Sequence, residues 1–187
     1  MPLSIADFGF VTARLRVRPA VADDRAIFCA LYADAPTMRL IAPPLTPEQA
    51  SRAFANLLRL QEASPLRVLV LAIVAAAGGQ TLGFVGCQEF DANAARLEIG
   101  LILDRRAHGK GFPPEVLTGF VARLFALLPV ETIEGRFPAA NTAADRAVRG
   151  IGFELDHAAM AASNDTEVRI RAAHRRHWLA WRADSSP

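Results

Sequence analysis

The chain has 187 residues, 52% of them apolar and 21% charged, and its formal net charge is +2. This length suits one domain, residues 1–187, that buries its own core, and two cysteines are too few for a disulfide framework. The start lacks a signal-peptide pattern, and the longest apolar run, Val68 to Ala77, is about half of a membrane span. We therefore expect a cytoplasmic protein without a membrane partner.

The charge pattern also bears on nucleic acid as a partner. The pI of about 8.9 reflects an excess of only two positive charges, and the arginines are scattered along the chain. A nucleic-acid surface would need a basic stripe with interleaved aromatic residues. We expect no nucleic-acid partner.

The first quarter of the chain predicts a strand and two helices. Residues Thr12–Pro19 alternate apolar and basic side chains, the period of a half-buried strand. A short helix follows the acidic pair Asp23–Asp24. The stretch Ala35–Leu45 contains three prolines and predicts a loop. Thr46–Gln49 is a capping box with proline at the first helical position, and it predicts the second helix.

The remaining elements follow from alternation, helical periodicity and glycine placement. Two β-rich runs, residues 67–77 and 81–90, flank Gly78-Gly79 and predict a hairpin. The later elements are a strand at Ala95–Asp104, a helix at Glu115–Leu128, a strand at Thr132–Phe137, a helix at Asn141–Gly150, strands beginning near Phe153 and at Val168, and a helical tail through Trp181.

This element order predicts an α/β fold with a mixed sheet and helices on both faces. The strand–helix–strand unit from Leu97 to Phe137 must place its two strands parallel, with a right-handed crossover. We expect a site at the carboxyl end of the first of these strands, where the helix begins.

The turn at that position carries the clearest chemical signal. It reads Arg106-Ala107-His108-Gly109-Lys110-Gly111-Phe112, with two glycines around a lysine just before a helix. Bare backbone amides at the positive end of a helix favour an anion, although the same pattern is also typical of a simple tight turn. It is neither a Walker A loop nor a dinucleotide fingerprint, because no Ser or Thr follows the lysine and the third glycine is missing.

Several segments in register resemble one protein family. The turn Arg106–Gly111 resembles the acyl-CoA pyrophosphate loop of the GNAT acetyltransferase superfamily. Other segments resemble its ribosomal-protein N-terminal (alanine/serine) acetyltransferase branch. These are the first strand at Thr12–Pro19, the third at Leu82–Gly86, the fourth at Leu97–Gly100, the Asn-x-x-Ser…Gly-Phe helix at Asn141–Phe153 and the closing tryptophan Trp178.

The resemblance implies a mostly antiparallel, twisted sheet whose central parallel strands splay apart to admit pantetheine. It implies acetyl-CoA as co-substrate, no metal, and transfer of the acetyl group to a primary amine of a protein N-terminus or a small molecule. Glu98 stands in the family's carboxylate position as a general base, or is a strand glutamate paired with an arginine. The implied cofactor-binding residues are Leu101, Ile102, Leu103, Arg106, Ala107, His108, Gly109, Lys110, Gly111, Phe112 and Asn141.

Three departures from the family pattern keep a second hypothesis open. Pro113-Pro114 stands where amides could donate to phosphate, and Ala144 replaces a serine. Leu101 replaces a usual aromatic, and the chain's one tyrosine, Tyr32, lies on the first helix, so the family's tyrosine acid is missing. The alternative is a GNAT-fold binding or regulatory protein with an impaired CoA site.

Other reactive or aromatic residues have structural interpretations. We expect Cys87 to be a buried small hydrophobe, and Trp178 and Trp181 to cover the core, with a homodimer contact as the second interpretation. His157, His174 and His177 carry no signal. We expect acceptor choice to depend on the Ala35–Leu45 loop and on residues 157–166.

Overall fold

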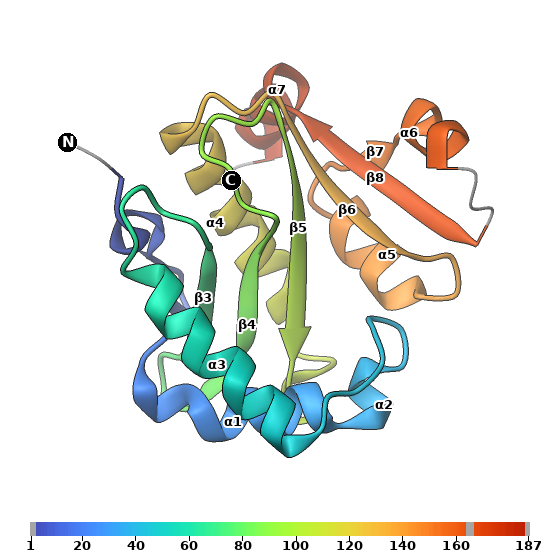
Figure 1. The fold of residues 1–187 in the computed structure, drawn as a ribbon. Helices are drawn as coiled ribbons and strands as arrows, with labels where there is room; N and C mark the ends of the chain where they lie inside the picture. The colour runs from blue at the N-terminus through green and yellow to red at the C-terminus, as the bar shows by residue number, and fades with distance from the viewer. Residues whose placement is uncertain (1–2, 164–166, 186–187) are drawn as a thin grey trace.

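The computed structural model describes residues 3–163 and 167–185, and within them eight strands form one sheet in the order β1-β2-β3-β4-β5-β6-β8-β7. Figure 1 shows this sheet running across the molecule. Neighbouring strands are antiparallel except for β5 and β6. The strands are β1 Phe10–Val11, β2 Leu15–Pro19, β3 Val70–Ala75, β4 Thr81–Gln88, β5 Arg96–Leu103, β6 Thr132–Pro138, β7 Glu154–Leu155 and β8 Val168–His174.

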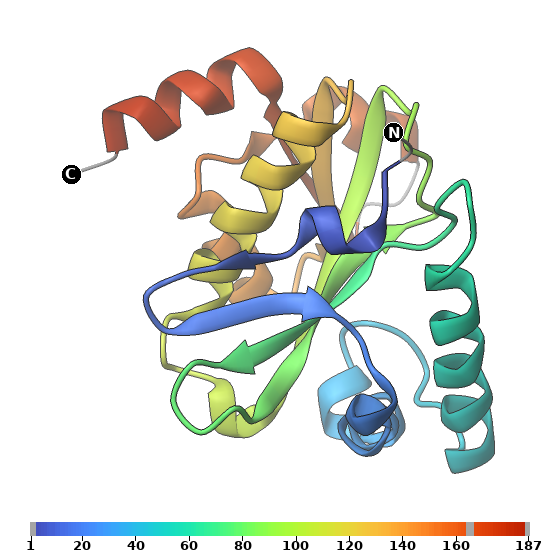
Figure 2. The same ribbon diagram turned by 90° about the vertical axis from the view of Figure 1, so that its left-hand side faces the viewer.

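Helices cover both faces of the sheet, as expected. Helices α1 and α3 lie on one face and α4 on the other, which the rotated view in Figure 2 shows. The helices are α1 Arg25–Ala33, α2 Ala35–Met38, α3 Pro47–Gln61, α4 Phe112–Leu127, α5 Thr142–Arg149, α6 His157–Ser163 and α7 Arg175–Ser185, with 3-10 turns at Ile5–Phe8, Ala22–Asp24 and Arg105–Ala107.

Each face of the sheet has its own apolar core. On the α4 side, Phe120, Val121 and Leu124 are fully buried against the strands. On the α1–α3 side, the ring of Phe28 lies 5.0 Å from Phe54 and 5.3 Å from Phe84, centroid to centroid. Aromatic packing of this kind fixes α1 and α3 to the sheet.

Most predicted elements are present. The hairpin turns at Gly78 and Gly79, whose φ angles of 82° and 64° suit glycine. The capping box opens α3, since the Gln49 amide donates to the Thr46 hydroxyl over 3.2 Å and the Thr46 amide donates to the Gln49 side chain over 2.8 Å. The mixed, mostly antiparallel sheet with helices on both faces is confirmed.

Two predictions of element boundaries were wrong. The Ala35–Leu45 stretch begins with helix α2, because Asp34 caps it by accepting from the Thr37 amide over 2.9 Å and proline is tolerated in a first turn. Helix α4 begins at Phe112 rather than Glu115, with both prolines in its first turn. For residues 157–166 we predicted no element; the structure has α6 at His157–Ser163, and residues 164–166 lie outside the described residues.

The parallel pair β5–β6 comes apart soon after it starts. Only Arg96, Leu97 and Glu98 pair with β6, opposite Thr132, Ile133 and Glu134, although both strands continue beyond these residues. Figure 1 shows the two strands diverging from a common start. The splayed central strands are thus confirmed, and among the residues that the structure describes no strand pairs with the β6-facing backbone of β5 beyond Glu98.

A buried carboxylate joins β2 to the β3–β4 hairpin. Asp24 is 2% exposed and accepts from Arg18 over 2.7 and 3.0 Å, from the Val21 amide over 2.9 Å and from the Thr81 hydroxyl over 2.7 Å. Burial raises the pKa of Asp24, but these hydrogen bonds outweigh burial and hold the pKa below its ordinary value.

We predict that Asp24→Asn destabilises the fold by about 3 kcal/mol at pH 7, because it leaves Arg18 without its charge partner. A lowered carboxyl pKa contributes stability above the unfolded value of about 3.9, and that contribution is lost as the pH falls through the folded value. The stability gap between wild type and variant, measured by urea unfolding, should therefore close below about pH 4. The exposed neighbour Asp23→Asn is the control and should cost little; a gap that stays constant with pH would contradict the assignment.

Candidate functional site

The loop before α4 presents unpartnered backbone amides. Gly109 and Gly111 have φ angles of 73° and 72°, in the left-handed region that favours glycine. In the part of the chain that the structure describes, the amides of Gly109, Lys110 and Gly111 donate to no protein acceptor, and the three residues are exposed. Together with the positive end of α4, this arrangement suits an anion.

Arg14 holds this loop from the other end of the sequence. Its guanidinium donates to the Lys110 carbonyl over 2.8 Å and to the Gly111 carbonyl over 3.4 Å, and it lies 4.8 Å from the centroid of the Phe112 ring. The carbonyls are thereby held by the turn that precedes β2, while the amides of the loop stay free.

A carboxylate in the first turn of α4 completes the anchor. Glu115 accepts from the Arg14 guanidinium over 2.7 Å and from the Arg14 amide over 3.2 Å, and also from the hydroxyl of Thr12. Burial raises the pKa of Glu115, yet the hydrogen bonds outweigh it and the pKa lies below its ordinary value. Its negative charge is therefore compensated by Arg14.

Other residues of the loop have protein partners. Arg106 is exposed and pairs with Asp104 over 2.7 Å, and this hydrogen bond, with the others from Arg106, lowers the pKa of Asp104 to about 2. Nε2 of His108 lies 3.2 Å from the Leu103 carbonyl oxygen. Ala107 is fully buried, so it could contact a ligand only through its backbone.

The prolines limit the number of donors at the start of α4. Pro113 and Pro114 lie in its first turn and have no amide hydrogen. The donors that remain at this end are the amides of the loop itself, up to Phe112.

The gap between the diverging strands β5 and β6, which we call the splay, lies between the loop and α5. Ile102 and Leu103 are buried and Leu101 is half-buried, so the side chains of this β5 segment pack in the protein and only its backbone edge is available. Asn141 caps α5, its side-chain oxygen accepting from the Ala144 amide over 3.1 Å. This cap leaves the side-chain NH2 group of Asn141 as a donor.

Glu98 stands where β5 and β6 part. It faces away from the buried side chains of Leu97 and Ile99, and its side chain is 31% exposed. The pKa of Glu98 lies above its ordinary value, first because of burial and also because of the Glu134 and Glu89 carboxylates, against the opposing effect of Arg136. A raised pKa suits a proton acceptor, and the neighbouring Arg136 shows that Glu98 is also a paired strand glutamate.

The sequence patterns did not single out the charged residues around Glu98. Glu134 on β6 is 6% exposed and pairs with Arg96, which also lies 3.1 Å from Asp156. Arg136, two residues further along β6, lies 3.5 Å from Glu98 and 3.8 Å from Glu134. Opposite charges at alternate positions of a short strand were the available signal.

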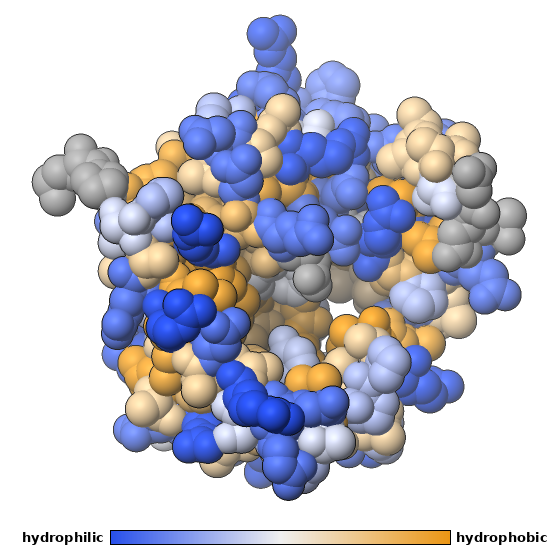
Figure 3. All heavy atoms as spheres, in the orientation of Figure 1, coloured by the Kyte–Doolittle hydropathy of each residue, from blue (hydrophilic) through white to orange (hydrophobic). Residues whose placement is uncertain are grey.

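A cavity of about 350 Å³ opens beside these charges. Figure 3 also shows a hollow in the molecular surface, between the part that carries the end of β5 and the part that carries α5. The cavity is lined by Arg96, Glu134, Arg136, Asp156 and, on α6, Ala158, Ala159, Ala162 and Ser163.

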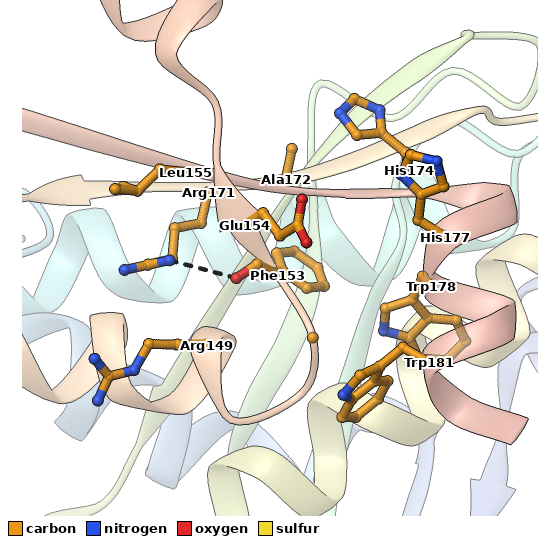
Figure 4. Close-up of a pocket in the computed structure, with 11 residues that line it drawn as sticks. Arg149, Phe153, Glu154, Leu155, Arg171, Ala172, His174, His177, Trp178 and Trp181 are labelled. Atoms are coloured by element: carbon orange, nitrogen blue, oxygen red, sulfur yellow. Dashed lines mark hydrogen bonds between the residues drawn. The ribbon is translucent and has the colours of Figure 1, made fainter. Parts of the chain in front are cut away.

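A second cavity, of about 390 Å³, lies between β7, β8 and α7 (Figure 4). Trp178 is 1% exposed and donates to the Ile151 carbonyl over 2.8 Å, so its place in the core is confirmed. Trp181 packs on Gly152, where an added Cβ would come within 2.5 Å of the indole. His174, at the end of β8, and His177, on α7, line the same cavity, whereas the predicted loop and β5 residues do not.

Two further findings concern residues 3–163 and 167–185 alone. Nowhere in them do three His, Cys, Asp or Glu side chains come together in a way that could hold a metal ion, and none of their helices is long and apolar enough to cross a membrane. Cys87 is buried, and burial raises its pKa to about 12, which fits a small core residue.

Several solved structures share this fold. Spermidine N-acetyltransferase from Vibrio cholerae, in complex with CoA and spermine, superposes with a TM-score of 0.73 at 14% identity, covering 90% of this chain and 99% of that one. An acetyltransferase from Agrobacterium tumefaciens gives 0.72 at 20%, covering 89% and 94%. RimL, the ribosomal L7/L12 alpha-N-protein acetyltransferase in complex with CoA, gives 0.72 at 14%, covering 88% and 96%.

Sequence comparison gives a more specific result than these distant structures. No curated protein matches the chain. The model of the family "Acetyltransferase (GNAT) domain" matches residues 14–154, from the arginine that anchors the loop to the start of β7. The chain therefore belongs to the GNAT acetyltransferase family.

Proposed function

We propose that residues 1–187 act as one domain that transfers an acetyl group from acetyl-CoA to a primary amine. The observation that carries the proposal is the set of unpartnered amides at Gly109, Lys110 and Gly111, next to an unpaired β5 edge. The first can hold a pyrophosphate and the second can hydrogen-bond an extended pantetheine arm as an added strand.

The binding roles follow from the positions of the donors. The loop amides and Lys110 would hold the pyrophosphate, with Arg106 at the rim. Leu101, Ile102 and Leu103 would pair with pantetheine through their backbone. The side-chain NH2 group of Asn141 would reach the same arm from the other side of the splay.

The chemistry would rest on Glu98 and on the backbone. Glu98 would take a proton from the acceptor amine, and an amide of β5 would polarise the thioester carbonyl. The CoA thiol, near a thiol pKa of about 8.5, can leave as a thiolate without a protein acid. Tyr32 does not serve as one, because it stacks on Phe28 at 4.3 Å and burial raises its pKa.

We further propose that the acetyl acceptor is an α-amine, either of a peptide N-terminus or of a small molecule. An α-amine of pKa about 7.7–8.0 is partly neutral at pH 7, whereas a lysine amine of pKa about 10.4 is almost wholly protonated. A site with one carboxylate base favours the former. The resemblance to the ribosomal-protein branch supports this choice, and RimL is among the structures that share the fold. The cytoplasmic location and a homodimer stay predictions.

The competing hypothesis is a GNAT-fold binding or regulatory protein that holds CoA weakly. Pro113, Pro114 and Ala144 favour it, because each removes a donor that the family pattern would supply. Calorimetry with acetyl-CoA separates the two: micromolar binding supports the acetyltransferase, and absence of binding supports the alternative.

We predict that Gly111→Val abolishes acetyl-CoA binding without unfolding the protein. Valine is strained at a φ of 72°, so the loop amides must move, while the nearest atom to an added Cβ is 3.7 Å away. Gly79→Val in the hairpin turn imposes similar strain at a φ of 64°, also in open space, and is the matched control. Calorimetry on both variants is the measurement; equal affinity of Gly111→Val and wild type would remove the loop from the site.

We predict that Pro113→Ala combined with Pro114→Thr tightens acetyl-CoA binding at least several-fold. The change restores two amides in the first turn of α4, and a hydrogen bond to a charged group is worth about 1.5–3 kcal/mol. Dissociation constants from calorimetry decide the outcome. If wild type already binds in the micromolar range and the double variant binds more weakly, the prolines serve to preorganise the helix start.

We predict that Glu98→Gln lowers kcat/KM most at low pH and little near pH 9. At low pH the amine is protonated and needs a base, whereas near pH 9 it is already neutral. A pH profile of acetyl transfer from pH 6 to 9 measures this, with thermal unfolding as the check on the fold. A loss of equal size at every pH would indicate a positioning role for Glu98.

A further inference from the structure

An ion pair spans the point where β5 and β6 separate. Glu98 is the last β5 residue paired with β6, and Arg136 lies on β6 beyond the last paired residue, Glu134. Nε of Arg136 lies 3.5 Å from a Glu98 carboxylate oxygen. The pair therefore stands at the inner end of the splay, beside the β5 edge that would hold the acyl donor.

The N–H donors of Arg136 make only long contacts to carboxylates. Its distances of 3.5 Å to Glu98 and 3.8 Å to Glu134 both exceed the usual length of a charge-assisted hydrogen bond. Its side chain is 40% exposed. Glu134 is instead satisfied by Arg96. A planar guanidinium in this state can donate to a second carboxylate in a two-point contact.

We propose that this pair selects a free α-amino acid as the acetyl acceptor, Glu98 taking the ammonium and Arg136 the carboxylate. The inference rests on the proposed acetyl transfer and narrows its acceptor from any α-amine to one that carries its own carboxylate. The ammonium and carboxylate of an amino acid sit on the same carbon, so both can meet a Glu–Arg pair whose charged atoms are 3.5 Å apart. A peptide N-terminus has no carboxylate there.

The cavity beside Arg136 has room for the side chain of such an acceptor. Its volume is about 350 Å³, and α6 contributes three alanines and a serine to its wall. Its charged groups compensate one another in part, because Arg96 contacts both Glu134 and Asp156. Of the two arginines that line the cavity, Arg136 thus has the longer contacts to carboxylates, and it is the one that contacts Glu98.

Arg136 would also assist the proton transfer. The carboxylate of a free amino acid favours the ammonium form of its neighbour, and a guanidinium that neutralises this carboxylate lowers the amine pKa. Glu98 then takes one proton from the ammonium, and the neutral nitrogen bonds to the thioester carbonyl carbon. The carbon–sulfur bond breaks, and the second proton lost from nitrogen neutralises the CoA thiolate. The products are the N-acetylamino acid and CoA.

The test compares free amino acids with their α-amides. L-Alanine, L-leucine and L-methionine, each paired with its amide, are offered with acetyl-CoA, and kcat/KM is followed by release of the CoA thiol. The amide keeps the α-amine and removes only the carboxylate. We expect wild type to prefer the acids at least about tenfold, the value of one charge-assisted contact.

Variants at Arg136 separate recognition from structure. Arg136→Gln should reduce the preference to near one by raising KM for the acids, while acetyl-CoA affinity from calorimetry and the melting temperature stay close to wild type. Arg136→Lys should restore part of the preference, because the charge returns without the two-point contact. Arg123→Gln, on the exposed side of α4, removes an arginine elsewhere and should keep the wild-type preference.

The outcomes distinguish this inference from the proposed function. Equal or better turnover of the amides, or of peptide N-termini, overturns the inference and leaves acetyl transfer standing. Binding of acetyl-CoA without acetylation of any free amino acid also overturns it. Failure to bind acetyl-CoA at all overturns the proposed function and the inference together.

Discussion

The early end of the β5–β6 pairing is the constraint on which the rest of the site depends. Adjacent parallel strands normally continue side by side, each satisfying the other's amides and carbonyls. Here the register stops at Glu98 and Glu134, so the remaining β5 edge is left for another hydrogen-bonding partner. The crossover helix α4 starts next to that open edge, which brings its positive end and the free loop amides to the same side of the molecule.

The loop can present its amides because its carbonyls are held elsewhere. Arg14 binds the carbonyls of Lys110 and Gly111 and is itself fixed by Glu115. These contacts join residues about a hundred positions apart in sequence, and they connect the edge of the sheet to the start of α4. The orientation of the loop is thus a tertiary property, set by the contacts of Arg14, in the turn between β1 and β2, with the loop and the start of α4, and not by the two glycines alone.

This dependence explains how much of the protein could be predicted from its sequence. Alternation located β5, and helical periodicity located α3 and α4, because both patterns depend on local burial. The glycine-lysine-glycine turn was found because it joins two such elements, and Glu98 because it lies on one of them. Arg14 and Arg136 were not found, since their roles come from contacts between segments far apart in the sequence, which periodicity does not encode. Helix α2 was missed because its proline lies in the first turn, where proline is tolerated, and the sequence alone does not distinguish this from a proline in a loop.

Two arginines at the loop are already paired with carboxylates. Asp104 neutralises Arg106, and with a pKa of about 2 it does so at any physiological pH. Arg14 is likewise engaged with Glu115. The loop thus relies on its oriented amides and on Lys110 for attraction, which act at short range and depend on geometry. Such attraction favours an anion that fits against the start of α4 over other anions. A CoA pyrophosphate requires this fit, because its position fixes the distance of the thioester from the reacting groups.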